Sequence, residues 1–338
     1  MQRKLYGFIK HAVRLSVRPM RPSVKPAIAL MMLAFGQHAG AQKADPLAAL
    51  SVQDRRLASI AERLMAANNR MCRQHMPGTG MVIQTRDQYG GDPAAEFANG
   101  PVAVAQVVPG SPAVGVIEPG DALIAIGAVP TASLHAEGKA PQRDAVFAAL
   151  ADSAAAAPLS LTIVRAGVER TVTLHPVPEC RALVEVRSSQ GDNARSDGRV
   201  IQLDYGLAAA ASDDQLAVIF AHELGHLVLE HRRRLSAAGV SKGFFGEFGR
   251  NRTLNREVEI EADRISVHLL ANAGYNPAIA PTFWRSPLGR RTSEMSLVYP
   301  SAEARAQLLE REIADYVRPG ATPSWPAHLL DRRDTPFN

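Results

Sequence analysis

Two histidines four residues apart constrain this chain more than any other feature of its sequence. His222 and His226 lie in the segment His-Glu-Leu-Gly-His. Upstream, Ser212–Gln215 reads Ser-Asp-Asp-Gln, which has the spacing of a capping box and predicts that a helix begins there. The apolar positions that follow are Leu216, Ile219, Phe220 and Val228. We therefore expect a buried helix that carries both histidines and runs to about Arg234.

Imidazoles at this spacing project from one face of a helix, about one turn apart, and can bind the same zinc ion. Glu223 lies beside that face. Zinc lowers the pKa of bound water, and a neighbouring carboxylate can accept the proton and deliver it to the leaving amine. Two core histidines are the alternative, but they leave a buried Glu223 unexplained. The pattern predicts His222 and His226 as zinc ligands and Glu223 as the catalytic acid/base.

A catalytic zinc site needs a third protein ligand, and two downstream acids are candidates. Glu247 has a spacing near that of the thermolysin-like gluzincins, but it lies in a glycine-rich segment that is a poor helix. Glu259 lies in a stretch, residues 256–273, that is helical by periodicity. Glu259 and Asp263 share a face of this helix, so one can bind zinc while the other accepts the N–H of a ligand histidine. We favour Glu259 as the ligand and expect Glu261, which points away, to be a solvated charge.

The N-terminal segment has the pattern of an export signal. The first 41 residues contain no acid and seven basic residues, and an apolar stretch at 27–35 precedes Ala39-Gly40-Ala41. This arrangement predicts a secretory signal peptide cleaved after Ala41. The alternative is an uncleaved membrane anchor, but the apolar run is far shorter than the roughly 20 residues that span a bilayer. We therefore expect a periplasmic or secreted protein.

Removal of the seven basic residues changes the formal net charge from +5 to −2. This charge does not support a basic nucleic-acid-binding surface, so we expect no nucleic-acid partner. No other stretch is long and apolar enough to cross a membrane, so we expect no transmembrane segment in the mature chain.

Cys72 and Cys180 are the only cysteines of the chain. In an oxidising compartment an even pair favours a disulfide, with two buried thiols as the alternative. Residues so widely separated cannot form a Cys-x-x-Cys metal knuckle, which makes them poor zinc ligands.

Upstream of the histidine helix, two segments of different texture are expected. Helical spacing of apolar residues predicts a helix over 51–73. Residues 78 to about 177 instead show short β-branched runs separated by Pro-Gly turn signals. Here we expect strands, one helix over 141–155 and a turn at Gly167. The predicted strands are Met81–Gln84, Val102–Val108, Ala122–Ile126, Leu159–Arg165 and Arg170–His175.

This second segment resembles PDZ domains of the bacterial exported-protease type. The resemblance rests on Val107–Ala113, which reads Val-Val-Pro-Gly-Ser-Pro-Ala, and on Ile117–Gly127, which contains Pro-Gly-Asp. Such domains bind an extended peptide at a sheet edge, and backbone amides receive its terminal carboxylate. The resemblance makes one turn the candidate peptide-binding loop, and a glycine turn without a ligand is the alternative. Its residues are Gly78, Thr79, Gly80 and Met81.

We interpret the PDZ-like segment as an insertion, because Cys72 and Cys180 lie on either side of it. The expected parts are a signal peptide (1–41), a leading helix that packs on the peptidase domain (42–77), a PDZ-like domain (78–178) and a zinc metallopeptidase domain (179–338).

The second half of the chain resembles the CAAX-prenyl-protease-like zinc metallopeptidases of the HtpX and BepA type. The resemblance covers roughly residues 180–315 plus the leading helix, and it implies Glu259 as third ligand with Asp263 as its supporting carboxylate. The supporting motifs, besides the His-Glu-Leu-Gly-His and Glu259–Asp263 segments, are Asp197–Ile201, Gly206–Leu207, Asp214–Ala217 and Ala273–Pro277.

This chain departs from the family pattern at one segment. Family members commonly carry Thr-His-Pro-Ser followed by an arginine. Here Val298–Ser301 reads Val-Tyr-Pro-Ser, and Arg305 follows. Tyr299 cannot bind zinc as a histidine does, but it could hydrogen-bond a developing oxyanion, with a packing tyrosine as the alternative. Arg305 is a second candidate for transition-state stabilisation.

Three further expectations concern the segments around the two metal helices. Phe244, Phe245 and Phe248 lie in a glycine-rich loop that is either a lid over the cleft or an ordered connection. His231 falls near the predicted end of its helix, where a cation suits the dipole. His268 is expected to be a packing residue.

The sequence thus predicts an α+β fold, in which a mainly helical zincin domain has a small sheet from Leu183–Val186 and Arg199–Leu203 and carries a β-rich PDZ-like insert. The expected function is a metalloendopeptidase with one zinc per chain, acting on peptides or unfolded proteins of the cell envelope. An envelope-protein partner of the PDZ-like domain is also expected. The alternative is a peptide-binding quality-control factor with a latent or structural zinc site.

Overall fold

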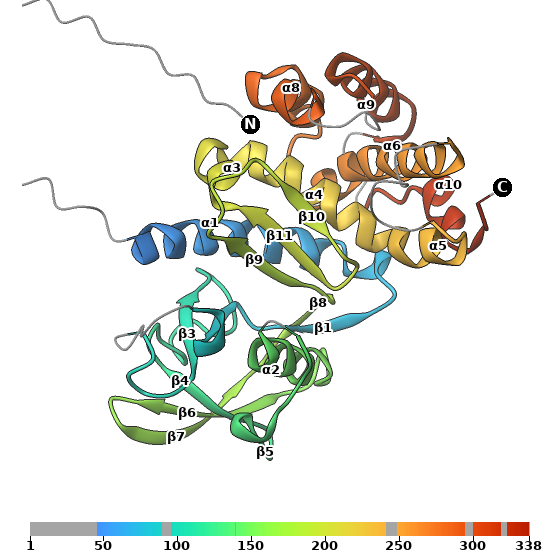
Figure 1. Cartoon of the computed structure of the whole chain (residues 1–338). Coiled ribbons are helices and arrows are strands. Elements are labelled where there is room, and N and C mark those ends of the chain that lie inside the picture. The colour runs from blue at the N-terminus through green and yellow to red at the C-terminus, as the bar shows by residue number, and fades with distance from the viewer. Residues whose placement is uncertain are drawn as a thin grey trace, which may run out of the picture. The chain divides into compact units, whose positions relative to one another are not determined.

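The described part of the chain packs around two hydrophobic cores, one mainly helical and one formed by a sheet and helix α2 (Pro141–Ala151) (Figure 1). The computed structural model describes residues 46–89, 96–138, 140–240, 249–294, 300–318 and 323–337. Helices and strands are mixed, as expected for an α+β protein. Among these residues no helix has the length and apolarity that a bilayer crossing requires.

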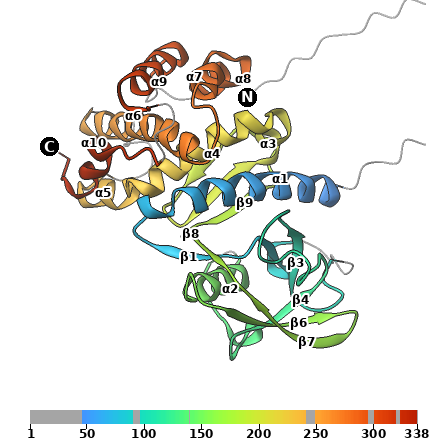
Figure 2. The same ribbon diagram turned by 180° about the vertical axis from the view of Figure 1, so that it is seen from behind.

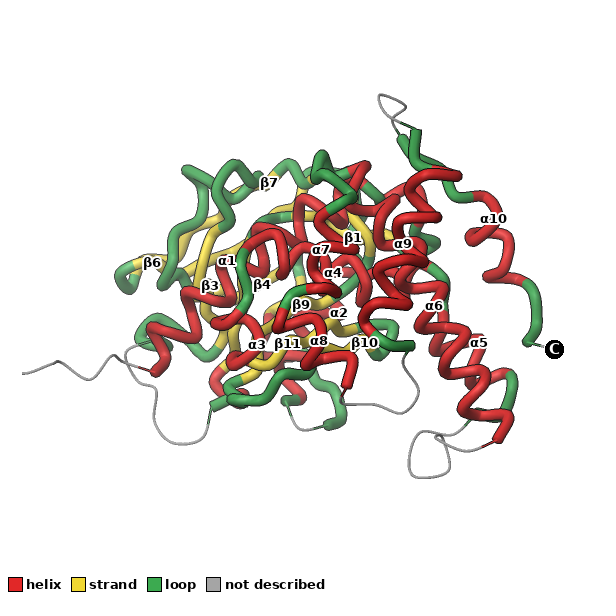
Figure 3. The backbone as a smooth tube through the Cα atoms, turned by 90° about the horizontal axis from the view of Figure 1, so that it is seen from above, coloured by secondary structure: helices red, strands yellow, loops and turns green. Residues whose placement is uncertain are grey.

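Helices α1 (Pro46–Ala67), α4 (Asp213–Val228) and α6 (Gly249–Asn272) form the larger core. Helices α4, α6, α7 and α9 lie in one group (Figure 3). The shorter helices are α3 (Tyr205–Ala210), α5 (His231–Ala237), α7 (Ile279–Arg285), α8 (Pro287–Glu294), α9 (Ala302–Tyr316), α10 (Ala327–Leu330) and the 3-10 turn η5 (Asp331–Asp334).

Gly225 explains how closely α4 and α6 can approach each other. A Cβ atom at this position would lie 2.7 Å from Ile265 Cγ2 and 3.1 Å from the Ala262 carbonyl oxygen, both on α6. Only a residue without a side chain therefore permits this helix crossing.

A three-stranded sheet lies against these helices. β9 (Leu183–Arg187) pairs in parallel with β11 (Val200–Asp204), and both strands were expected from the sequence. β10 (Ala194–Ser196) was not expected, and it pairs antiparallel with β11 at one end of the strand order β10-β11-β9.

A second sheet encloses the smaller core, and we call this part of the chain (residues 81–174) the sheet module. Its strand order is β2-β3-β4-β6-β7, with the short β5 beside β4, and helix α2 (Pro141–Ala151) contributes Val146 to the core. The elements are β2 (Met81–Thr85), η2 (Arg86–Gln88), β3 (Val102–Val107), β4 (Ala122–Ile126), β5 (Val129–Pro130), η3 (Thr131–Ser133), β6 (Leu159–Arg165) and β7 (Val168–Leu174).

A two-stranded ribbon joins the parts that surround the two cores. β1 (His75–Gly78) pairs antiparallel with β8 (Val177–Cys180), so the chain enters and leaves the sheet module side by side. At the base of this ribbon Cys72 and Cys180, 108 positions apart, form a disulfide, which confirms the predicted bridge. Helix α1 and the 3-10 turn η1 (Asn69–Met71) lead into the ribbon, and α1 lies between the helical group and the sheet module (Figure 2).

The helix ends differ from the sequence prediction. α1 ends at Ala67 rather than Arg73, and α6 begins at Gly249, seven residues before the expected start. α4 ends at Val228 rather than near Arg234, because Glu230 adopts a left-handed conformation (φ 52°) that breaks the helix before α5 begins. This break has consequences for the histidine cluster.

Candidate active site

The N-terminal cap of α4 sets the start of the helix that carries both histidines. Ser212 Oγ accepts a hydrogen bond from the Gln215 N–H (3.3 Å), and Gln215 Oε1 accepts one from the Ser212 N–H (3.0 Å). The predicted capping box is therefore present. On this helix His222 and Glu223 are 8% and 7% exposed, so the expected metal ligand and the expected acid/base are both largely withdrawn from solvent.

Three potential metal donors from α4 and α6 converge. His222 Nε2 lies 3.1 Å from His226 Nε2 and 3.2 Å from Glu259 Oε2, and His226 Nε2 lies 3.6 Å from Glu259 Oε1. Ligands about 2.0–2.1 Å from a tetrahedral zinc ion are separated by roughly 3.3 Å. The three donors therefore have the chemistry and the spacing that a zinc ion requires.

Asp263 and Arg305 hold His222 from behind. The His222 Nδ1–H donates to Asp263 Oδ1 (3.0 Å), so Nε2 is the ring nitrogen that faces the other donors. Arg305 donates to both oxygens of Asp263 at 2.6 Å and stacks on the Trp284 ring at 3.4 Å. Both Asp263 and Arg305 are almost fully buried, so the bidentate pair fixes the carboxylate that orients His222.

His226 has a comparable support, which the sequence did not reveal. Its Nδ1 lies 2.8 Å from Nδ1 of His231, whose Nε2 lies 3.1 Å from Glu261 Oε2. Since Glu261 accepts the Nε2–H, the neutral His231 has an acceptor at Nδ1, and His226 donates to it and directs its own Nε2 toward the metal position. Arg234 donates to Glu261 as well.

Two expectations about this cluster were wrong. Glu261 is 1% exposed and pairs with His231, Arg234 and Arg332, so it is not a solvated charge. His231 is not a cation at a helix end, because it begins α5 and is 2% exposed. On a continuous helix residues five apart point about 140° away from each other. Only the helix break at Glu230 brings His231 back to His226, and no periodic pattern contains that information.

The electrostatics of the site favour positive charge where the donors meet. Burial opposes the charged form of His222, but hydrogen bonds and charges of Asp263 and Glu259 outweigh it and raise the pKa of His222 to about 10. Burial would raise the pKa of Glu259, yet the two histidines hold it well below the usual value. A cation placed between these groups would thus meet a carboxylate that is already ionised.

Glu223 and His231 are shifted in ways that suit their positions. Burial raises the pKa of Glu223, partly offset by His226 and His222, which brings this carboxyl closer to the range of an acid/base at neutral pH. Burial is also the main cause that lowers the pKa of His231 to about 3. His231 is therefore neutral and can act as an acceptor.

Glu223 and His222 open into a cavity of about 190 Å³. Arg305 and Trp284 form part of its wall, and Asp192, Asn193 and Ala194 bring the start of β10 to its rim. The edge strand that the sequence did not predict thus lies beside the expected acid/base.

Several sequence expectations lie away from this centre. Arg305 lines the cavity, and its guanidinium is bound to Asp263. Stabilisation of the transition state by Arg305 stays a prediction. The Gly78–Met81 turn lies in the β1–β2 region, and Thr79, Gly80 and Met81 of this turn line a different cavity. His268 is fully buried and lies 3.1 Å from Glu312. Outside the described residues lie Glu247, Tyr299, Phe244, Phe245 and Phe248.

A second group of potential ligands comprises His268, Glu312 and His328. Both imidazoles are within 3.1 Å of Glu312 Oε1, and Arg264 donates to Oε2 at 2.6 Å. Because an arginine and two imidazoles already compensate this carboxylate, we assign no metal to it.

A helix with His-Glu-x-x-His and a carboxylate from a second helix form an arrangement that is typical of the zincin class of metal sites. Comparisons with known proteins agree with this class. Residues 164–248 match Peptidase family M48. The protein named "Mitochondrial metalloendopeptidase OMA1" of Arabidopsis thaliana is 29% identical over 136 residues, which cover 33% of this chain and 27% of that relative. The chain thus matches about a quarter of the length of this relative. Both similarities are to metallopeptidases.

Proposed function

We propose that this chain is a zinc-dependent endopeptidase in which His222, His226 and Glu259 hold the metal and Glu223 acts as acid/base. The observation that carries the proposal is the convergence of three donors from two helices at 3.1–3.6 Å. The family M48 match includes the two histidines, and Glu259 is supplied by the adjoining helix α6.

A zinc ion at these residues supplies Lewis-acid chemistry, which acidifies water and polarises a peptide carbonyl. Glu223 takes a proton from the attacking water and returns it to the amine of the leaving peptide. Asp263 keeps His222 in the tautomer that binds metal through Nε2, and His231 does the same for His226.

The edge of β10 is the proposed place for the substrate backbone. In the described part of the chain, β11 is the only strand that pairs with β10, and the start of β10 lines the same cavity as Glu223. An extended peptide that adds to this edge brings its backbone beside the acid/base by main-chain hydrogen bonds. Backbone recognition of this kind suits unfolded protein segments.

The cellular setting and the domain organisation are part of the same proposal. A signal peptide over 1–41 leads to an exported chain with substrates among envelope proteins, and the disulfide is compatible with an oxidising compartment. The parts are the leading helix (42–77), the PDZ-like insert (78–178), which recruits peptides, binds an envelope partner or regulates access, and the HtpX- and BepA-type peptidase domain (179–338). The disulfide at the base of the β1–β8 ribbon and the separate sheet core support this division.

The test is cleavage of an unfolded protein by purified wild-type protein and by the Glu223→Gln variant. We expect Glu223→Gln to abolish cleavage while one zinc per chain remains bound, and a chelator to abolish wild-type cleavage. Glu169→Gln, an exposed change on β7, is the matched control and should cleave normally. Zinc binding without cleavage by the wild type would favour the quality-control factor with a latent site, and unimpaired Glu223→Gln would refute the role of Glu223.

A further inference from the structure

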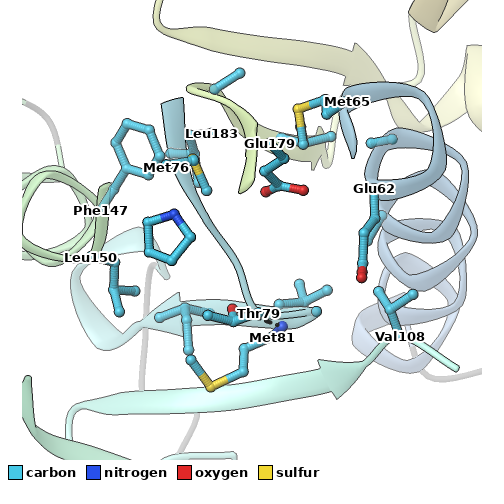
Figure 4. Close-up of a pocket in the computed structure, with 18 of the residues that line it drawn as sticks. Glu62, Met65, Met76, Thr79, Met81, Val108, Phe147, Leu150, Glu179 and Leu183 are labelled. Atoms are coloured by element: carbon cyan, nitrogen blue, oxygen red, sulfur yellow. Dashed lines mark hydrogen bonds between the residues drawn. The ribbon is translucent and has the colours of Figure 1, made fainter. Parts of the chain in front are cut away.

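A second cavity, of about 110 Å³, lies where α1, α2 and the β1–β8 ribbon meet (Figure 4). On one side it borders β2, which is an end strand of the sheet module. On the other side it borders β9, which packs against the helical core. Its apolar walls include three methionines, which are long and adaptable side chains. The labelled apolar residues around it include Met65, Met76, Met81, Phe147, Leu150 and Leu183 (Figure 4).

Two acids interrupt these apolar walls. Glu62 reaches the cavity from α1 and Glu179 from β8 (Figure 4). Glu179 is only 5% exposed, and within the described residues neither Glu62 Oε2 nor Glu179 Oε2 has a hydrogen-bond partner. Buried carboxylate oxygens without a partner destabilise a fold, so their presence here points to a ligand.

The cation at the rim of the cavity is already neutralised. Arg143 lines the cavity from α2, but it forms ion pairs with Asp144 (2.9 Å) and Glu185 (2.5 Å). The space between Glu62 and Glu179 therefore lacks a compensating charge among the lining residues.

Both acids lie against the glycine turn that the sequence suggested as a receptor for a terminal carboxylate. A Cβ atom on Gly78 would lie 2.9 Å from Glu179 Oε2, and one on Gly80 would lie 3.1 Å from Glu62 Oε2. Moreover, the Met81 N–H already donates to Thr79 Oγ1 at 3.3 Å. An incoming carboxylate would meet two acids at this turn, whereas a cation would be attracted.

The pKa values of both acids are raised. Burial raises the pKa of Glu62 to about 7, and burial together with Glu62 raises the pKa of Glu179 well above its ordinary value. A cation bound between them favours the ionised carboxylates, so binding near neutral pH must release protons.

We propose that this cavity binds a basic side chain of a peptide, with the aliphatic stem against the methionines and the cationic head between Glu62 and Glu179. A long stem with a charged tip matches a cavity that is apolar along its walls and acidic at its end. The peptide backbone lies along β2, which stands at the end of its strand order. This assignment concerns binding alone and does not rest on the proposed peptidase activity.

The test uses the full chain with Glu223→Gln, so that cleavage cannot obscure binding. The probes are fluorescein-labelled valine-threonine peptides that differ at one central position, lysine or norleucine, each with a free or an amidated C-terminus. We expect the lysine peptide to bind about tenfold or more tightly than the norleucine peptide, irrespective of the C-terminus. Calorimetry in buffers of different ionisation enthalpy should show proton release.

Variants then locate the binding site. Glu62→Gln and Glu179→Gln should each remove most of the preference for lysine, while Glu169→Gln should leave it unchanged. If Glu179→Gln does not fold, the half-buried Glu62 provides the decisive variant. The proposal would be overturned by equal affinity for the lysine and norleucine peptides, or by no binding of either peptide. It would also be overturned if binding required a free C-terminus and took up protons.

Discussion

Gly225→Ala tests the helix crossing on which the metal site depends. Gly225 lies between His222 and His226 on α4, and Ile265 and Ala262 of α6 occupy the space that a methyl group would need. The substitution therefore pushes apart the two helices that supply the histidines and Glu259.

The expected magnitude follows from the contact distances. A Cβ atom 2.7 Å from Ile265 Cγ2 must move by about 1 Å to reach an ordinary carbon–carbon contact. Overpacking of a core costs about 1–3 kcal/mol, against a gain of about 1 kcal/mol from the better helix propensity of alanine. We expect a net loss of up to about 2 kcal/mol in the free energy of unfolding. Displacement of Glu259 from the histidines should lower zinc affinity about tenfold or more.

Urea denaturation of the metal-free protein and zinc titration against a chromophoric chelator measure the two effects. Ile265→Ala provides the partner for a double-mutant cycle, because it removes the Cγ2 atom in question. Gly225→Ala should cost at least about 0.5 kcal/mol less in that background. A gain of stability near 1 kcal/mol with unchanged zinc affinity would refute the close crossing of α4 and α6.

Three further predictions concern the disulfide, the histidine support and the buried acid. Replacement of Cys72 and Cys180 by serine should lower the free energy of unfolding by about 5 kcal/mol, since the bridge closes a loop of more than 100 residues, and a loss below about 1 kcal/mol in urea denaturation would contradict this. His231→Ala should weaken zinc binding about 10–100-fold in chelator competition, because His226 loses its hydrogen-bond acceptor, and unchanged affinity would exclude that role. The pKa of Glu62 is about 7 in the folded protein, above its ordinary value of 4.5. Between these two pH values the folded state holds a proton that the unfolded state has lost, so the free energy of unfolding decreases as pH rises toward 7. Glu62→Gln should therefore raise the melting temperature at pH 8.5 and leave it nearly unchanged at pH 4, and equal effects at both pH values would argue against a raised pKa.

Local periodicity carried the predictions about individual helices and strands. The capping box placed the start of α4, and residues four apart on one helix face put His222 with His226 and Glu259 with Asp263. Most predicted strands lie within a residue or two of their observed ends, because alternation and turn residues act over short distances. Element ends were less accurate where a tertiary contact or a single left-handed residue, such as Glu230, decides them.

The sequence by itself thus determined which side chains each helix presents, and its two cysteines indicated the bridge. Only the tertiary structure decided which partners these side chains meet. The turn at Glu230 returns His231 to His226, Glu261 is buried by a neighbouring helix, and Arg305 reaches Asp263 from 42 positions away. The same holds for Glu62 and Glu179, which share one cavity although they lie far apart in the chain. Periodicity records orientation within one element, whereas these contacts depend on how separate elements pack, and no local pattern encodes that packing.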